Sequence, residues 1–332
     1  MQQYIRNVRL TAGNGQFVAA SDGNGLCIRF QVEQAVRGTP AHAIIDVLNT
    51  KSETNAKFTS KQYTQVSLAA GYREQGGSPP TIFTGEAIQA RVFRENATDT
   101  VLQIVARSSD KARNFAYVNK ALASGHTADD RLQIAVEAFK QQGVMPGIIE
   151  SIGTIKYPRN FVAHGMAHDL LRELCTARQA KWWIQGEKLN VVRDNSALPN
   201  STIVLTSATG LIGIPEQTIE GVQFTALLNP LIVPGCRVKI DNRSITQAQF
   251  GASYASEGTN QLYLDPNTLG LNADGLYKVL KVAHTGNTRG NEFYTHGWCV
   301  GIGADNAALR AQGVYDDVNM GVPDAFPSVG GK

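Results

Sequence analysis

Apolar and polar residues alternate along several short segments in the first third of the chain. The clearest segments are residues 26–33, 66–72 and 88–92. A period of two is typical of a strand with one buried face. Residues 101–106 are more continuously apolar, which predicts a strand covered on both faces. Turn segments rich in Gly, Pro, Asn and Asp separate these runs, so residues 1–107 are predicted to form an all-β unit.

Residues 108–157 change from a strand pattern to a helical one. Thr127, with Asp130 three residues later, predicts a capping box at the start of a helix. Gly143 suits the position just after its end. Between them, apolar residues recur at helical spacing: Leu132, Ala135, Val136 and Phe139. This region is therefore predicted to be a small helical linking domain.

Strand patterns return after Tyr157, with one helix inserted. The helix is predicted by an apolar stripe of Met166, Leu170, Leu171 and Leu174. Residues 183–192 predict a hairpin, and strands are expected near 276–284 and 292–302. Residues 247–271 show little periodicity and are expected to form a long loop.

The segment from Leu211 to Ile240 combines strand alternation with two breaks. Val222, Phe224, Ala226 and Leu228 alternate with mostly polar residues, and Asn229-Pro230 ends the run. Pro234-Gly235 then supplies a turn, after which Val238 and Ile240 resume the alternation. These features predict a β-hairpin whose two strands are joined by the Pro-Gly turn.

The composition is that of an ordinary folded protein of up to two core-forming domains. The 332 residues are 42% hydrophobic and 18% charged, and the net charge of +3 comes from scattered Lys and Arg. That charge does not favour nucleic-acid binding. No apolar run approaches the length of a membrane span, and no secretory signal is visible at the N-terminus. The cysteines lack CxxC spacing and are expected to be buried reduced thiols: Cys27, Cys175, Cys236 and Cys299.

Two groups of histidines were considered as chemical sites. His164 and His168, four residues apart with Asp169 adjacent, resemble part of a zinc motif. Gly165 stands where a hydrolytic zinc site needs Glu, and His164 is expected to precede the helix, so a structural role is preferred. His284 and His296 share a region with Cys299 and Asp274, but nothing in their spacing implies a Cys-His nucleophile.

Other candidate motifs also have structural interpretations. Gly13-Asn14-Gly15 and Gly23-Asn24-Gly25 lack the helix and Lys of a phosphate loop and are predicted to be turns. The pairs Asp129-Asp130 and Asp316-Asp317 could be glycosidase carboxylates, but the first lies at a helix cap and the second in a predicted tail. No catalytic, cofactor-binding or metal-ligating residue is therefore assigned.

Aromatic residues offer a possible interaction surface. Trp182-Trp183 and Tyr72 could mark such a surface, because aromatic side chains are enriched at interface hot spots. The alternative is that one Trp lies in the core and its neighbour packs beneath a loop. The sequence leaves both interpretations open.

Several motifs together resemble one known family. Gly210-Leu211-Ile212-Gly213 with Pro215-Glu216 precedes Gly221-Val222, Leu227-Leu228-Asn229-Pro230 and Pro234-Gly235. Segments near the front, at 66–72, 82–85 and 99–104, and near the back, at 275–279 and 284–291, occur in the expected order. Over residues 1 to about 303, the chain resembles the baseplate hub proteins of contractile phage tails.

The resemblance implies a mainly β fold with α insertions (α+β): two tail-tube-like antiparallel β-barrels joined by a small helical linking domain. The boundaries would be 1–107 for the first barrel, 108–157 for the linking domain, 158–303 for the second barrel and 304–332 for a flexible tail. Such hubs form homotrimers in which six barrels surround an axis, and contacts between subunits are expected at barrel edges, for example at Val279.

The implied protein is a non-enzymatic virion component of the tail baseplate, or of a phage-derived contractile injection particle, assembled in the host cytoplasm. It would adapt a sixfold tail tube to a threefold central spike and line the axial DNA path. The implied partners are the spike and tail tube proteins, with the tape-measure and baseplate wedge proteins as further candidates. No cofactor, membrane or sequence-specific nucleic acid is implied. The alternatives are a cell-wall hydrolase of the tail tip and a receptor-binding tail protein, although fibrous repeats are absent.

Overall fold

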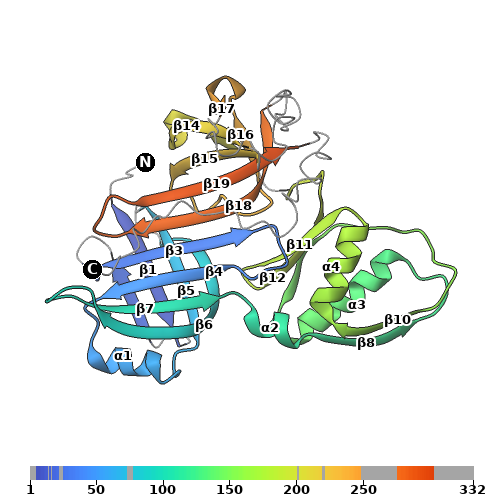
Figure 1. Cartoon of the computed structure of the whole chain (residues 1–332), viewed down its shortest axis with the longest axis horizontal. Coiled ribbons are helices and arrows are strands. Elements are labelled where there is room, and N and C mark those ends of the chain that lie inside the picture. Colours follow the sequence, from blue (N-terminus) through green and yellow to red (C-terminus); the bar gives the residue numbers. More distant parts are fainter. Residues whose placement is uncertain are drawn as a thin grey trace, which may run out of the picture. The chain divides into compact units, whose positions relative to one another are not determined.

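A computed structural model shows a mainly β protein with a few helices (Figure 1). The chain divides into two compact units. It describes residues 5–13, 15, 17–21, 25–72, 78–199, 202–218, 221–247 and 275–302. Unit 1 contains the described residues up to Asp194 together with Gly286–Glu292. Unit 2 contains those from Asn195 to Thr285 and from Phe293 onward. Most of the predicted loop and the predicted tail lie outside the described residues.

Unit 1 contains an antiparallel sheet in the order β3-β4-β7-β6-β5-β1-β2. Its strands are β1 (Arg6–Ala12), β2 (Phe17–Ser21), β3 (Ile28–Ala35), β4 (His42–Leu48), β5 (Gln65–Tyr72), β6 (Thr81–Arg94) and β7 (Thr100–Arg107). The alternation predicted for residues 26–33 is confirmed, because Ile28, Phe30 and Val32 are buried between less buried neighbours. One face of the sheet therefore forms a core and the other is polar.

Strand β6 changes its partners halfway along its length. Residues 81–86 pair with β5, whereas residues 86–94 pair with β7, with a register shift between Ala87 and Gln89. Gly85 lies at this change, and a Cβ atom there would approach the Arg107 carbonyl oxygen to 2.4 Å. Any larger residue would push the two backbones apart. Beyond the change, β7 is the one strand partner of β6 among the described residues.

A helix interrupts the region that the sequence predicted to be all β. Helix α1 (Ser52–Thr59) buries a single side chain, Phe58, which packs against Phe17 and Tyr63 at ring distances of 5.4 and 5.1 Å. The helix has no side-chain cap at its start. Because α1 has a single buried apolar residue and no capping side chain, its sequence shows no helical pattern. The all-β prediction for residues 1–107 is therefore wrong at this helix.

The rest of unit 1 combines helices with two small sheets. The helices are α2 (Asp110–Phe115), α3 (Ala128–Gln141) and α4 (Ala167–Ala177). Strands β8 (Tyr117–Leu122) and β10 (Phe161–Met166) form an antiparallel ribbon. Strand β12 (Lys188–Arg193) pairs with β11 (Ala180–Gln185) and, in parallel, with β9 (Met145–Ile149).

The predicted starts and turns of this region are confirmed. Thr127 and Asp130 form the capping box of α3, with the Asp130 backbone N–H 3.2 Å from the Thr127 Oγ1 atom. Gly143 has φ 89° just after the helix. The hairpin β11–β12 turns at Gly186 and Glu187, both with positive φ, as a tight hairpin turn requires.

One hydrophobic core joins residues from both sides of the predicted boundary at residue 157. It includes Leu132 and Phe139 of α3, Leu171 of α4, and Trp182 and Val191 of the β11–β12 hairpin. Helix α4 and this hairpin therefore pack with the helical linking region, whereas the sequence grouped them with the second barrel. The periodicity located each element but carried no information about which core the element joins. The division into four separately folding domains stays a prediction.

Unit 2 contains a sheet in the order β17-β14-β15-β19-β18-β16-β13. Its strands are β13 (Ile203–Leu205), β14 (Leu211–Thr218), β15 (Gly221–Leu227), β16 (Arg237–Ile240), β17 (Thr246–Gln247), β18 (Leu276–Asn287) and β19 (Phe293–Gly301). Short 3-10 turns, η1 (Ser207–Thr209) and η2 (Asn242–Ser244), lie between some of them. The pairs β13–β16 and β14–β17 are parallel, whereas β14–β15, β15–β19 and β16–β18 are antiparallel.

The predicted hairpin across Pro234-Gly235 is wrong. Strand β15 pairs with β14 and β19, while β16 pairs with β13 and β18. The segment between β15 and β16 instead carries the buried residues Ile232 and Cys236, and the Gly235 N–H binds the Val279 carbonyl at 2.7 Å. Alternation identified the strands correctly, but it does not specify which strands pair.

Val279 does not lie at an exposed strand edge. Its side chain is buried, and its own N–H donates to the Cys236 carbonyl at 3.0 Å. The expectation that Val279 marks a contact between subunits is therefore wrong. Most strand pairs are antiparallel, so the mainly β, antiparallel character is confirmed. Among the described residues, the first and last strands of each sheet do not pair with each other, and the two closed barrels stay a prediction.

The tip of the β18–β19 hairpin belongs to unit 1, where Arg6 of β1 holds it. The Arg6 guanidinium donates to the backbone carbonyls of Asn287, at 2.5 Å, and Gly290. It also donates to the Asn291 carbonyl at 3.0 Å. Since charged hydrogen bonds are the strong ones, one side chain fixes most of the turn.

Candidate functional site

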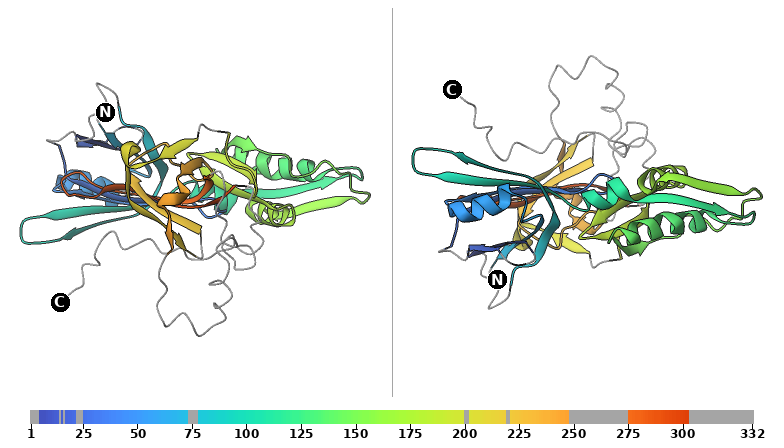
Figure 2. Two further views of the ribbon diagram at one scale, coloured as in Figure 1. Left: turned by 90° about the horizontal axis from the view of Figure 1, so that it is seen from above. Right: turned by 90° about the horizontal axis from the view of Figure 1, so that it is seen from below.

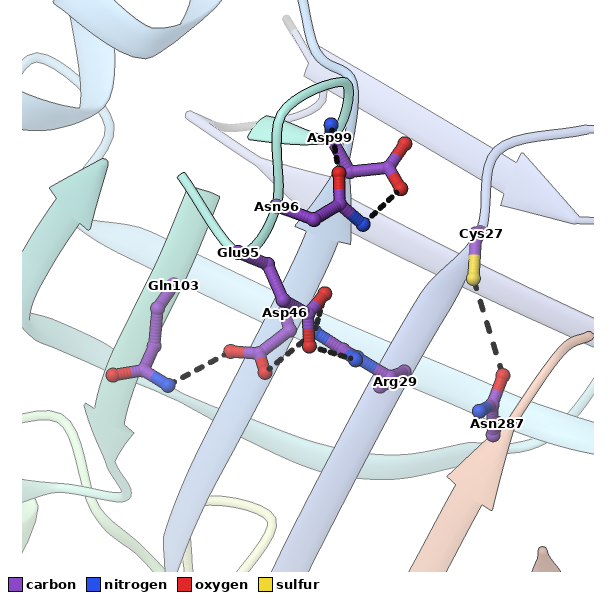
Figure 3. A network of polar contacts seen from close by, with 8 residues as sticks. All are labelled: Cys27, Arg29, Asp46, Glu95, Asn96, Asp99, Gln103 and Asn287. Atoms are coloured by element: carbon purple, nitrogen blue, oxygen red, sulfur yellow. Dashed lines mark hydrogen bonds and ion pairs between the residues drawn. The ribbon is translucent and has the colours of Figure 1, made fainter. Parts of the chain in front are cut away.

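A row of polar side chains crosses the face of the unit 1 sheet opposite its core (Figure 3). Arg29 on β3 lies opposite Asp46 on β4, Asp46 opposite Gln103 on β7, and Gln103 opposite Arg91 on β6. Period-2 alternation places the first three on one face, because their sequence neighbours are buried, and the cross-strand position opposite Gln103 places Arg91 on the same face.

Arg29 and Asp46, two of the charged residues in this row, are each paired with neighbouring side chains. Arg29 donates two hydrogen bonds to the Glu95 carboxylate, at 2.8 and 3.1 Å, and lies 3.6 Å from Asp46. Gln103 Nε2 donates to Asp46 Oδ1 at 2.9 Å. The bond to Glu95 raises the pKa of the Arg29 guanidinium. Burial raises the pKa of Asp46, and the bonds from Gln103 and Arg29 act against this.

The turn between β6 and β7 is fixed onto the same face. Asn96 Oδ1 accepts from the backbone N–H groups of Thr98 and Asp99, at 2.9 and 2.7 Å. Side-chain bonds from Asn49 and Asn96 lower the pKa of Asp99. The whole network resembles a charge-balanced structural surface, since each of its carboxylates is engaged by donors rather than directed at a free site (Figure 3).

Beyond the network, β6 exposes apolar side chains. Ile88 is 43% exposed and Val92 is 41% exposed, although the sequence alternation predicted a half-buried strand here. Figure 2 shows the β6–β7 hairpin extending past the neighbouring strands of its sheet. The exposure arises because β5 stops pairing with β6 at Glu86.

Unit 2 exposes a second apolar segment on β14. The pairing of β14 with β15 is irregular between Ile212 and Glu216, and Gly213 there has φ 69°. This bulge buries Pro215 and leaves Ile214 63% exposed and Ile212 38% exposed. Bulges re-aim side chains, and here the bulge directs an isoleucine into solvent.

The outer face of the β8–β10 ribbon is a third exposed area. Tyr117 and Val162 are exposed there, and the Tyr117 hydroxyl is 2.9 Å from the His164 ring nitrogens. Phe115 precedes the ribbon and is also exposed.

The structure does not bring the histidine pair His164 and His168 onto one helical face. His164 lies on β10 and contacts Tyr117, whereas His168 lies on α4 and its Nδ1 is 3.0 Å from the Arg113 carbonyl. The helix begins after His164, so the two rings do not share a helical face. In the part of the chain that the structure describes, no group of three or more His, Cys, Asp or Glu residues could hold a metal ion.

The unit 2 histidines are structural. His284 Nδ1 is 2.9 Å from Thr295 Oγ1, and His296 Nδ1 is 3.1 Å from Thr225 Oγ1. Burial lowers the pKa of His284 to about 4, so this ring is neutral near pH 7. The Cys299 thiol donates to the Val222 carbonyl at 3.2 Å, and burial raises its pKa. A buried neutral thiol is a poor nucleophile. Asp274 lies outside the described residues.

The acidic pairs and glycine turns also have structural roles where they are described. Asp129 accepts from Ser151 Oγ at 2.6 Å and from the Ile152 N–H at 2.7 Å, while Asp130 caps α3. Gly13, with φ 60°, lies between β1 and β2. Asp316-Asp317, Asn14, Gly23 and Asn24 lie outside the described residues.

The two tryptophans are not a surface. Trp182 and Trp183 are both buried, and Trp182 packs against Phe139 with ring centroids 5.9 Å apart. The interaction-surface interpretation of this pair is wrong, and Tyr72 is half-buried. All four cysteines are free; Cys175, Cys236 and Cys299 are buried as expected, and Cys27 is half-buried. None of the described helices is long and apolar enough to span a membrane.

The fold is similar to those of solved phage tail proteins. The 43 kDa tail protein of prophage MuSo2 from Shewanella oneidensis matches with a TM-score of 0.55 and 9% identity, over 90% of this chain and 98% of that one. A tail protein from Neisseria meningitidis matches with a TM-score of 0.52 and 9% identity, over 91% and 98%.

A third similar structure is a type VI secretion system component of E. coli. It matches with a TM-score of 0.50 and 9% identity, over 88% of this chain and 76% of that one. That protein is described as similar in structure to the T4 bacteriophage tail proteins gp27 and gp5. At these identities the similarity concerns the fold alone.

The amino-acid sequence, rather than the fold, identifies the family to which the chain belongs. No curated protein matches the chain. The family model for baseplate hub gp41 matches residues 47–245, which is more than half of the chain, and confirms the resemblance recognised in its motifs. The chain therefore belongs to the baseplate hub gp41 family and is a structural protein of a phage tail baseplate.

Proposed function

We propose that this protein forms a homotrimeric hub that joins the sixfold tail tube to a threefold central spike and surrounds the axial DNA path. The observation that carries the proposal is the family match over residues 47–245, combined with two β units in each chain. Three chains with two units each would present six β units around one axis. The proposal includes the spike and tail tube proteins as direct partners, and the tape-measure and wedge proteins as candidates.

The polar face of the unit 1 sheet fits a role without catalysis. Two of its cations are paired with carboxylates, Arg29 with Glu95 and Asp46, and Arg107 with Asp110 at 3.6 Å, and Arg91 is hydrogen-bonded to the neutral Gln103 at 2.7 Å. A face on which most cations are paired with carboxylates does not accumulate the phosphate contacts that would hold DNA in place. Such a face suits a passage along which DNA must move.

The mass of the purified chain in solution tests the trimer. Native mass spectrometry is expected to give three times the chain mass of 35.8 kDa. Adding the spike protein should give a complex of three chains of each protein. A monomer or dimer at every concentration up to those used for reconstruction would refute the trimeric hub.

Reconstruction of the particle's tail tip tests its location. The chain is expected on the tail axis, between tube and spike, in three copies. Its presence on peripheral fibres, or in another copy number on the axis, would refute the proposal while leaving the family membership intact.

The proposal also requires the absence of a hydrolytic metal site. Elemental analysis of the purified protein is expected to show no stoichiometric zinc. Stoichiometric zinc that is lost in His168→Ala would overturn this expectation and would favour the alternative function, a cell-wall hydrolase.

A further inference from the structure

We propose that two exposed apolar surfaces, one on each unit, are the two halves of one contact between neighbouring copies of this chain. The β6 surface comprises Ile88, Val92 and Arg94, and the β14 surface comprises Ile212, Ile214 and Glu216. The inference rests on the proposed trimer and adds to it the residues through which one copy meets the next.

The β6 surface lies on a strand edge that the chain leaves open. Among the described residues, positions 88–94 pair only with β7, so the opposite edge has no strand partner. The segment contains neither Pro nor Gly, and Ile88 and Val92 are more than 40% exposed although α1 packs against β6. Unpaired apolar edges of this kind promote association unless a partner covers them.

The β14 surface is presented by the bulge at Gly213. Nothing lies within 4 Å of a Cβ atom built at Gly213, so this glycine is required by its φ of 69° rather than by lack of space. The conformation turns Ile214 outward, to 63% exposure, while Pro215 is buried. Glycine adopts this φ without strain, but a large apolar side chain held in water is unfavourable, which is expected where a partner covers that side chain.

Charge and symmetry pair these two surfaces with each other. Arg94, which is exposed and lies two residues beyond Val92, flanks the β6 surface, whereas the exposed Glu216 flanks the β14 surface. A closed ring of three identical chains needs a head-to-tail contact between two different surfaces, because a surface that pairs with itself ends at a dimer. Each chain offers one surface of each kind, with opposite charge.

The β8–β10 ribbon provides a matched control. Val162 is 66% exposed on an antiparallel strand pair, as much as Ile214, but it lies in unit 1 with the β6 surface. Its cross-strand partner is the uncharged Ala121, and Lys120 of the same ribbon is paired with Glu137 at 3.0 Å, whereas Ile214 has the exposed Glu216 two residues away.

Single variants test each surface. Val92→Lys and Ile214→Lys are each expected to convert the trimer to a monomer, raising the apparent dissociation constant at least about tenfold. Val162→Lys should remain a trimer. Near-UV circular dichroism and melting temperature identify variants that misfold. The near-isosteric Val92→Thr and the slightly smaller Ile214→Thr provide a second, milder pair that should weaken the trimer in the same direction.

Mixing the two lysine variants gives the decisive result. Val92→Lys retains an intact β14 surface and Ile214→Lys an intact β6 surface, so an equimolar mixture can form one good contact and should give a complex of one chain of each variant. A mixture that stays monomeric, a single variant that remains trimeric, or a trimer lost in Val162→Lys would overturn the inference. If the wild-type chain itself is not a trimer, the proposed function fails first, and the two failures are thereby distinguished.

Discussion

The sheets of the two units are built from different kinds of strand pairing. In unit 1, successive strands pair repeatedly, as in β1–β2, β3–β4, β5–β6 and β6–β7, and every pair of that sheet is antiparallel. In unit 2, β15 pairs with β19, so that Val222 lies opposite Cys299, and two pairs are parallel. Both sheets also contain pairs of the other kind, since β4 pairs with β7 in unit 1 and β14 pairs with β15 in unit 2. Long-range pairing must overcome the entropy of closing a long loop, so the larger share of local pairs should let more of the unit 1 sheet form from local contacts.

The two sheets also differ in what they bury. Among the described residues, no polar side chain is fully buried on strands β1 to β7. Unit 2 buries several on its strands: Gln217, Lys278, Lys281, His284, Thr285 and Thr295. Buried polar groups are tolerated only with partners, so the unit 2 core depends on specific hydrogen bonds where the unit 1 core depends on apolar packing.

The largest effect is expected from removing one core phenylalanine in each unit. Phe30 in unit 1 and Phe293 in unit 2 are both almost completely buried. Replacing either with Ala should cost about 3–5 kcal/mol of unfolding free energy, because it removes buried area and leaves a cavity. Calorimetry should show Phe30→Ala lowering one thermal transition and Phe293→Ala another. If both variants lower a single shared transition, the units do not unfold separately.

Acid should weaken unit 2 through His284. Burial holds its pKa at about 4, below the ordinary value of 6.5, so the unfolded chain takes up a proton first as the pH falls. The stabilising contribution is complete above pH 6.5 and is lost between there and about pH 4, amounting to about 3 kcal/mol. Chemical denaturation across this range would measure it.

A non-titrating variant isolates that effect. His284→Asn can keep the bond to Thr295 but cannot gain a proton, so its stability should fall less steeply with acid. Burial also lowers the pKa of His296, which adds a smaller dependence of the same sign. An unchanged pH profile in His284→Asn would contradict the assignment.

A smaller effect should come from the cap of α3 in unit 1. Thr127→Ala removes the side-chain oxygen that accepts from the Asp130 N–H, at an expected cost of about 1 kcal/mol. Thr127→Ser retains the oxygen and serves as the control. Equal stability of the Ala and Ser variants would show that the cap contributes nothing measurable.

The smallest effect should come from the polar face of unit 1. Glu95→Gln weakens the bidentate pair with Arg29, in which both side chains are partly exposed, and should cost less than about 1 kcal/mol. The loss should shrink as salt is added, because exposed charges are screened. Glu53→Gln, which removes the exposed contact to Lys57 at 3.9 Å, should have no measurable effect.

The comparison also explains how far the sequence could predict the fold. Alternation and the Thr127 cap located most strands and α3, because these signals are local. The partner of β16 could not be predicted, since β16 pairs with strands distant in sequence. Helix α1 was missed because one buried residue, Phe58, makes no pattern.

The candidate site was less predictable than the fold. Ile88 and Val92 look the same in the sequence as residues on a half-buried strand, and their exposure depends on β5 ending its pairing at Glu86. The segment Gly213-Ile214-Pro215 does contain a local signal for the β14 bulge. Both Gly and Pro inside a strand are typical of a bulge. Trp182 and Trp183 show the opposite case: they could mark an interaction surface by residue type, yet both are buried. Aromatic residue type alone does not distinguish a core position from a surface position.

The hydrogen bonds from Arg6 to the tip of the β18–β19 hairpin limit which positions of this turn can change in sequence. The guanidinium binds backbone carbonyls of Asn287, Gly290 and Asn291, which every amino acid supplies. The side chain at position 291 can therefore change without loss of these hydrogen bonds, whereas Lys at position 6 would lack the second arm of donors. Gly290 is restricted for another reason, as a Cβ atom there would approach the Asn287 side chain to 2.5 Å. Among related hubs, we expect the sequence of this turn to drift while the arginine at its base and the path of its backbone remain.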